Sequence, residues 1–136
     1  MTDDKRLPHC LFFLRVSIFL VMFMWTIDKL VRPEHAAGVF EKFYFLSGFG
    51  GSIMVVIGVL ELLFLLCFLS GFKKTVTYGG VLLLHGISTL SSYKQYFSPF
   101  EGASLLFFAA WPMLAACYLL YRFREADSMY TISKAA

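Results

Sequence analysis

Long apolar stretches alternate with short polar connections along this chain. The apolar stretches cover residues 11–31, 51–69, 76–92 and 103–121. A helix that crosses a bilayer needs about 20 predominantly apolar residues. We therefore expect an all-α fold in which residues 1–136 form a single membrane domain, a four-helix transmembrane bundle with spans near these boundaries.

The connection between the first two spans carries a different pattern. Phe40, Phe43 and Tyr44 recur at helical spacing, with Glu41 and Lys42 between them. An apolar face beside a charged one is typical of a helix that lies on the membrane surface. We expect a short interfacial helix there, between helices 1 and 2.

The remaining connections are short or irregular. Residues 71–75 form a tight basic turn. Residues 93–102 are rich in aromatic side chains and are broken by Pro99, which is typical of a turn at headgroup level. We expect the polar residues after Tyr121 to form a loose tail.

The composition supports lipid as the solvent for much of the chain. It is 59% hydrophobic and 18% aromatic, with a mean hydropathy of +0.72 and 15% charged residues. A soluble domain carries about 25% charged residues, and so small a chain has too little interior to hide this much apolar surface. The net charge of +3 is too small to indicate a nucleic-acid partner.

The basic residues indicate an orientation. With four spans, the side that holds both termini carries Lys5, Arg6, Lys73, Lys74, Arg122, Arg124 and Lys134. The opposite side carries Lys29, Arg32, Lys42 and Lys94. Loops rich in Lys and Arg remain in the cytoplasm. The N and C termini are therefore both predicted to be cytoplasmic.

Three ionisable residues are expected at bilayer depth within the predicted spans: Arg15, Glu61 and His85. Such a group costs about 2.5–3.5 kcal/mol at the centre of a bilayer, so it usually has a partner or a function. Glu61 and His85 both lie roughly 12–14 Å from the cytoplasmic ends of neighbouring helices, so they can meet near the midplane. For Arg15 two partners stay open, the lipid headgroups and Glu61.

Helix three carries a polar seam. His85, Ser88, Thr89 and Ser92 are spaced i, i+3, i+4 and i+7, which places them on one helix face. We expect this face to turn inward, and the apolar remainder, Val81 included, to turn toward lipid. Small polar residues also help membrane helices to pack, so a purely structural role for the seam stays open.

The cysteines do not indicate a metal or redox centre. Cys10, Cys67 and Cys117 lie far apart and form no C-x-x-C motif, so we expect no metal site and no thiol–disulfide chemistry. A haem held between two histidines at mid-membrane depth is excluded, because only His85 lies there.

Several stretches resemble the DoxX-like family of small four-helix membrane proteins. They are LRVSIFLVMFMWTIDKL in the first span and GVLELLFLLCFLSGF in the second. The second fits the family-like arrangement of Gly58, Glu61 and Gly71, and Arg15 and Lys29 stand where the family's first helix has basic residues. The resemblance implies a multi-pass protein of the bacterial cytoplasmic (inner) membrane. It also implies a link to quinone or redox chemistry, because the family includes a small subunit of thiosulfate:quinone oxidoreductase.

The leading hypothesis is a redox- or quinone-associated membrane subunit, an accessory subunit rather than a stand-alone enzyme. His85 and either Ser88 or Thr89 would bond to a quinone carbonyl, and Glu61 would exchange the proton. No residue is assigned as catalytic beyond this proton-exchange candidate. The residues expected at the cofactor are His85, Ser88, Thr89, Trp111 and Arg15, with Trp111 stacked on the ring.

Two alternatives stay open. The first is a structural or assembly partner of a membrane complex, which would dock through the aromatic loops. The second is a small proton or solute transporter, which would act as a homo-oligomer because four helices are few for a pathway.

Overall fold

The computed structural model describes residues 4–48 and 50–132, and these residues are predominantly helical. No β-strand occurs in this part of the chain. The elements are α1 (Arg6–Val31), α2 (Pro33–Tyr44), α3 (Gly51–Ser70), α4 (Lys74–Ser91), α5 (Tyr93–Phe97), the 3₁₀-helix η1 (Ser104–Ala109) and α6 (Ala110–Arg122). The all-α prediction is confirmed.

Within the described residues, three helical stretches are long and apolar enough to cross a membrane. They are Arg6–Val31, Gly51–Ser70 and Ser104–Arg122. The predicted span 76–92 corresponds to α4, which is a helix of 18 residues. Its polar side chains make α4 less apolar than the other three, so a fourth span remains a prediction.

The last predicted span is not one uniform helix. It begins as η1 and becomes α-helical only at Ala110. Pro112 lies in the first turn of α6, where its missing N–H is tolerated. The same missing N–H cannot bond to the carbonyl of Phe108, which favours a different backbone geometry before this point.

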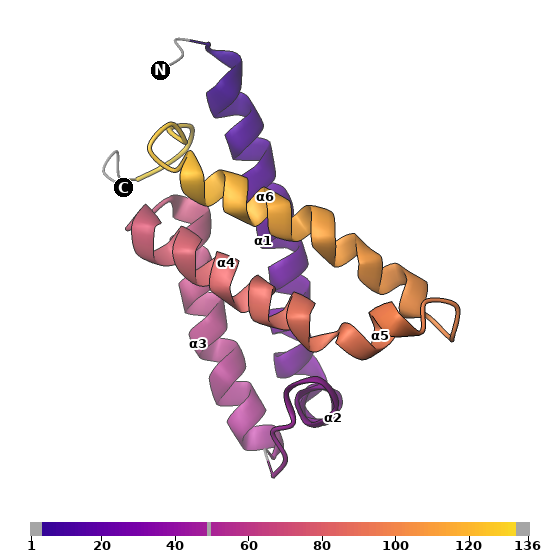
Figure 1. Cartoon of the computed structure of the whole chain (residues 1–136). Coiled ribbons are helices and arrows are strands. Elements are labelled where there is room, and N and C mark those ends of the chain that lie inside the picture. The colour runs from indigo at the N-terminus through magenta and orange to yellow at the C-terminus, as the bar shows by residue number, and fades with distance from the viewer. Residues whose placement is uncertain (1–3, 49, 133–136) are drawn as a thin grey trace.

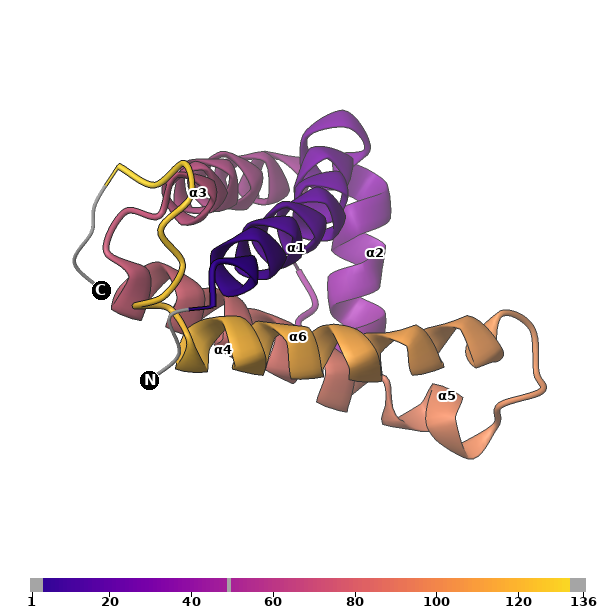
Figure 2. The same cartoon turned by 90° about the horizontal axis from the view of Figure 1, so that it is seen from above.

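The helices form two pairs that cross each other. α1 packs along α3, and α4 packs along α6. Figure 1 shows α4 and α6 inclined across α1 and α3, and Figure 2 shows the same crossing from above. The amphipathic segment predicted before the second span is indeed a helix, α2, which contacts α1, α3 and α4.

A small apolar core lies where the two pairs meet. It consists of Leu11, Ile18, Leu65, Phe68, Tyr78, Val81, Cys117 and Leu120. The burial of Val81 shows that its predicted outward position was wrong. Tyr78 lies one turn before it on α4 and packs edge-on against the Phe68 ring, so this face of α4 turns toward α3.

The outer surface is strongly apolar. Leu20, Leu60 and Leu83 are each about 60% exposed, at 59%, 62% and 64%, on three different helices. A water-soluble monomer rarely presents large contiguous apolar areas. The exposed faces of these helices therefore support contact with a lipid bilayer.

The segment after α6 is packed rather than loose, so the predicted loose tail was wrong. Asp127 is fully buried, and the Tyr130 ring lies 5.1 Å from that of Phe12. The amide of Ile132 donates to the carbonyl of Ser70 over 2.9 Å. Residues 123–132 thus connect the start of α1 with the end of α3 (Figure 1).

Candidate functional site

A large groove opens between α1, α2, α4 and the η1–α6 region. Its volume is about 1230 Å³, and most of its wall is apolar. Val21 and Met22 line it from α1, Phe43 from α2, and Leu106 and Met113 from the last helices. Ligand sites in proteins have similar character, with apolar walls and a few polar groups that orient the ligand. We call this cavity the groove.

The groove contains an ion pair. Lys29 Nζ lies 3.1 Å from Glu61 Oε2, with side chains only 10% and 27% exposed, and both residues line the groove. Thr26 Oγ1 lies 3.2 Å from the same carboxylate oxygen. The predicted partners of Glu61 were His85 and Arg15, so the pair with Lys29 corrects that expectation.

Gly58 explains why α1 and α3 approach closely enough for this pair. A Cβ atom at Gly58 would lie 2.8 Å from Leu30 Cδ2 and 3.2 Å from Lys29 Cβ. Contacts this short require the neighbouring side chain to move. Gly58 stands one turn before Glu61 on α3, so the absent side chain leaves room for Leu30 and for the Lys29 side chain that reaches the carboxylate.

His85 is held by the α6 backbone. Its Nε2 lies 3.0 Å from the carbonyl oxygen of Ala110, and the residue is only 8% exposed. A carbonyl oxygen can only accept, so Nε2 carries a proton. In the neutral ring Nδ1 is then an acceptor. Among the described residues Nδ1 has no hydrogen-bond partner, and His85 lines the groove.

The hydroxyl groups of the polar seam divide into two kinds. The Thr89 hydroxyl donates to the His85 carbonyl over 2.8 Å, and that of Ser92 to the Ser88 carbonyl over 3.2 Å. Both residues are buried, which confirms that the seam turns inward. Ser88 lines the groove, and its hydroxyl has no partner among the residues described.

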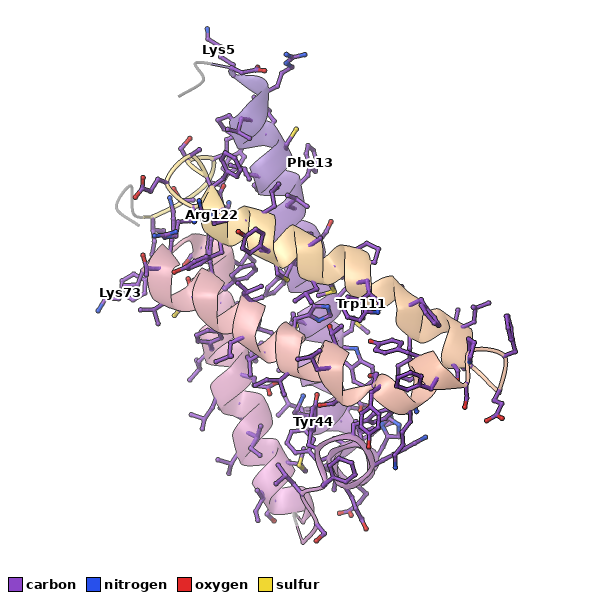
Figure 3. All side chains as sticks on the ribbon, viewed as in Figure 1. Lys5, Phe13, Tyr44, Lys73, Trp111 and Arg122 are labelled. Atoms are coloured by element: carbon purple, nitrogen blue, oxygen red, sulfur yellow. The ribbon has the colours of Figure 1, made fainter. Side chains whose placement is uncertain are left out.

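Trp111 lies outside the groove. It is 45% exposed, and its ring lies 5.6 Å from that of Tyr96. Figure 3 labels its side chain on α6. The Tyr96 hydroxyl donates to the Thr89 carbonyl over 2.8 Å. Burial raises the pKa of Tyr96, which keeps this donor protonated. Trp111 therefore contacts α5, at the end of α4, rather than the groove.

Arg15 belongs to a separate buried cluster. Its Nη1 lies 2.6 Å from Asp127 Oδ2, and its Nη2 lies 2.5 Å from the carbonyl oxygen of Met129. The Tyr78 hydroxyl and Lys74 Nζ also donate to Asp127, to its carboxylate and its carbonyl respectively. Neither of the two predicted partners of Arg15, headgroups or Glu61, is the one observed.

The predicted site residues therefore separate. Glu61, His85 and Ser88 line the groove, whereas Thr89 lies behind its wall. Trp111 and Arg15 lie elsewhere. Within the described residues there is no group of three or more His, Cys, Asp or Glu side chains suited to a metal ion.

Sequence reasoning missed two contributors to the groove. Lys29 was counted among the basic residues on the outer side of the membrane, although its place three residues after Thr26 puts it on the buried face of α1. The aromatic face of α2 was assigned to the membrane surface, although Phe40 and Phe43 line the groove. In both cases the residue pattern showed the helix face but not what that face contacts.

No protein-family model, characterised protein or solved structure matches the chain. The resemblance to the DoxX-like family therefore remains a prediction.

Proposed function

We propose that the protein is an accessory subunit of the bacterial cytoplasmic membrane that holds a lipid-soluble quinone-type ligand in the groove. It crosses the membrane four times and keeps both termini in the cytoplasm. One observation carries the proposal. A cavity of about 1230 Å³ has apolar walls, yet it exposes the Lys29–Glu61 pair and His85. Such a cavity suits a ligand with an apolar chain and a small polar ring.

The contacts between chain segments support the four-span topology. Lys74 and Arg15 both bond to the segment around Asp127, so the start of α4 and the first half of α1 lie together with the segment that follows α6. The Phe43 ring of α2 and the Phe107 ring of η1 stack 5.7 Å apart, which brings the helix after α1 close to the start of the last span. This arrangement suits two clusters of loops on opposite sides of a bilayer.

In this function the groove residues have different roles. His85 and Ser88 contact the polar ring of the ligand, and Glu61 exchanges a proton with it. The rings of Phe40 and Phe43 form the apolar wall against which the ring rests. Thr89, Trp111 and Arg15 act in the packing of the protein instead.

A second candidate function is that of a structural or assembly partner in a membrane complex. It is favoured by the exposed aromatic residues beside α5. Phe97 is 85% exposed and Phe100 is 89% exposed, on a connection that protrudes from the bundle (Figure 2). Aromatic residues of this kind are enriched at protein interfaces. This function requires no ligand in the groove.

The position of the two tryptophans permits a direct test of ligand binding. Trp25 lines the groove, whereas Trp111 does not. The Trp111→Phe variant leaves Trp25 as the only tryptophan, and Trp25→Phe leaves Trp111 as the matched control. Each variant is titrated in detergent with a short-chain benzoquinone, which quenches indole fluorescence.

We expect saturable quenching of Trp25 and only weak, linear quenching of Trp111. The His85→Phe substitution should raise the quinone concentration needed for half-maximal quenching of Trp25. Leu83→Ala should leave it unchanged, because Leu83 is 64% exposed on the outer face of α4. Equal and non-saturable quenching of both tryptophans would mean that the quinone only partitions into the micelle. The structural function would then be the better one.

A further inference from the structure

We infer that the groove prefers a ligand ring that donates hydrogen bonds, such as the hydroquinone form, over the quinone form, which only accepts them. This inference rests on the proposed function and specifies the chemical form of the ligand. It follows from the polar atoms that line the groove and from the partners that they already have.

His85 contributes an acceptor. One of its ring nitrogens faces the Ala110 carbonyl oxygen at 3.0 Å and must therefore carry the proton of the neutral ring. This holds for either orientation of the imidazole, because the carbonyl cannot donate. The remaining nitrogen, which has no partner among the described residues, can then only accept.

Glu61 contributes a second acceptor. Lys29 Nζ and Thr26 Oγ1 both lie beside Oε2, at 3.1 and 3.2 Å. In the part of the chain that the structure describes, no donor lies within hydrogen-bond distance of Oε1. A carboxylate has no proton to donate, so its free oxygen can serve only a ligand that donates.

Lys29 is the one charged donor beside this carboxylate in the described part of the chain, and its protons face other groups. Besides Glu61, its Nζ lies 3.5 Å from the Trp25 carbonyl oxygen and 5.7 Å from the centre of the Phe40 ring. An ammonium group has three protons. The Glu61 carboxylate and the Trp25 carbonyl accept two of them, and the Phe40 ring is the remaining neighbour.

The hydroxyl groups that line the groove do not discriminate between the two forms. The side chains concerned are Ser17, Ser88, Tyr44 and Tyr93, because the hydroxyl protons of Ser91 and Ser92 already go to backbone carbonyls. A hydroxyl group can donate to a carbonyl or accept from another hydroxyl. The indole N–H of Trp25 also lines the groove and can only donate, so it suits a quinone carbonyl. The preference for a donating ligand therefore rests on His85 and Glu61, which present two acceptors against this one donor.

The two ligand forms differ at just these atoms. A quinone carbonyl facing Nδ1 or Oε1 leaves two acceptors opposed and unpaired. A hydroquinone hydroxyl in the same place donates to either one. Sites built around a ligand hydroxyl discriminate strongly against analogues without it, since the site's own polar groups then lose their partner. We expect a preference of at least about tenfold for the hydroquinone.

The test compares the two forms on the full chain. The Trp111→Phe protein is titrated without oxygen with a short-chain benzoquinone, and the corresponding hydroquinone is then used to displace it. The expected result is a dissociation constant at least about tenfold lower for the hydroquinone. A tenfold preference also raises the two-electron midpoint potential of the bound couple by about 30 mV, which voltammetry of the loaded protein measures.

Two variants locate the origin of the preference. Glu61→Gln adds an amide donor of similar size, and His85→Phe removes the ring acceptor. Each substitution should reduce the ratio of the quinone dissociation constant to that of the hydroquinone. Leu83→Ala on the outer face of α4 should leave this ratio unchanged. An unchanged preference in both groove variants would contradict the assignment to these two side chains.

The same comparison on the otherwise unchanged protein tests this inference separately from the proposed function. Equal affinity for both forms, or tighter binding of the quinone, would overturn this inference and leave the proposed function standing. If neither form binds, the proposed function fails and the inference fails with it.

Discussion

Arg15 of α1 and Asp127 of the segment after α6 form a buried ion pair, although 112 residues separate them in sequence. The side chains are 1% and 0% exposed. Tyr78 donates a further hydrogen bond to the carboxylate, and Lys74 to the Asp127 carbonyl. The pair thus joins the first helix, the fourth helix and the last described segment at one point.

Removing one partner of this pair should strongly destabilise the protein. Asp127→Ala leaves the Arg15 guanidinium buried without its counter-ion, and breaking a buried pair in this way costs about 3–5 kcal/mol. We expect a clear fall in the midpoint of thermal unfolding in detergent. Glu125→Ala is the matched control, because Glu125 lies on the same segment, is not fully buried and should be silent.

The double variant Arg15→Leu/Asp127→Leu removes both charges. It should recover much of the stability that Asp127→Ala loses, because no unpaired charge remains. If Asp127→Ala were as stable as the wild-type protein, the packing of residues 123–132 onto the helices would be contradicted.

Gly58 should resist enlargement. Gly58→Val introduces a Cβ atom that would lie 2.8 Å from Leu30 Cδ2 and 3.2 Å from Lys29 Cβ, with two methyl groups beyond it. Overpacking of this kind costs about 1–3 kcal/mol, and it should also separate Lys29 from Glu61. Gly86→Val is the control in α4, because only Leu114 Cδ1 lies near a Cβ there, at 3.8 Å. The prediction fails if both substitutions have the same effect on thermal unfolding.

The Lys29–Glu61 pair should show energetic coupling. We expect a double-mutant cycle with Lys29→Met and Glu61→Leu to give a coupling energy of about 0.5–3 kcal/mol, because the two side chains touch and are largely shielded from water. The exposed Arg6–Asp4 pair, cycled in the same way, is the control and should show no measurable coupling. Additive effects at Lys29 and Glu61 would show that the contact carries no energy.

The number of membrane crossings can be measured with cysteine labelling. Four crossings put both ends of the described chain on one side, and three put them on opposite sides. Cys10 is exposed on the first helix, and a cysteine introduced at the exposed Ser128 reports on the other end. The cytoplasmic prediction requires that an impermeant maleimide modify each site, present as the sole cysteine, only after the cells are permeabilised.

A third position completes this experiment. Phe97→Cys lies on the protruding connection after α4 and should react in intact cells, since four crossings place it outside. Reaction of the cysteine at 128 in intact cells, with Cys10 protected, would indicate three crossings instead.

The sequence predicted helix faces better than it predicted contacts between helices. The spacing of His85, Ser88, Thr89 and Ser92 correctly indicated one inward face of α4, because a period of 3.6 residues fixes which side chains share a face. The spacing of Phe40, Phe43 and Tyr44 likewise indicated α2. These features depend on residues close together in the chain.

The contacts of Arg15 and Glu61 could not be predicted in the same way. Depth along a helix gives the height of a side chain but not the direction in which it points. Glu61 was therefore placed at the height of His85, while the rotation of α3 and the close approach at Gly58 turn it toward Lys29. Asp127 was missed because it lies in a polar segment whose composition resembles that of a free tail.

The distance in sequence between Arg15 and Asp127 also sets an order of events during synthesis. The ribosome releases the first helix long before the segment that holds the carboxylate, so Arg15 enters the membrane without its counter-ion. An uncompensated cation costs about 2.5–3.5 kcal/mol at the bilayer centre and less near its surface, where Arg15 lies. A nascent chain interrupted before residue 127 keeps that penalty, while one that continues past it loses the penalty as the ion pair closes.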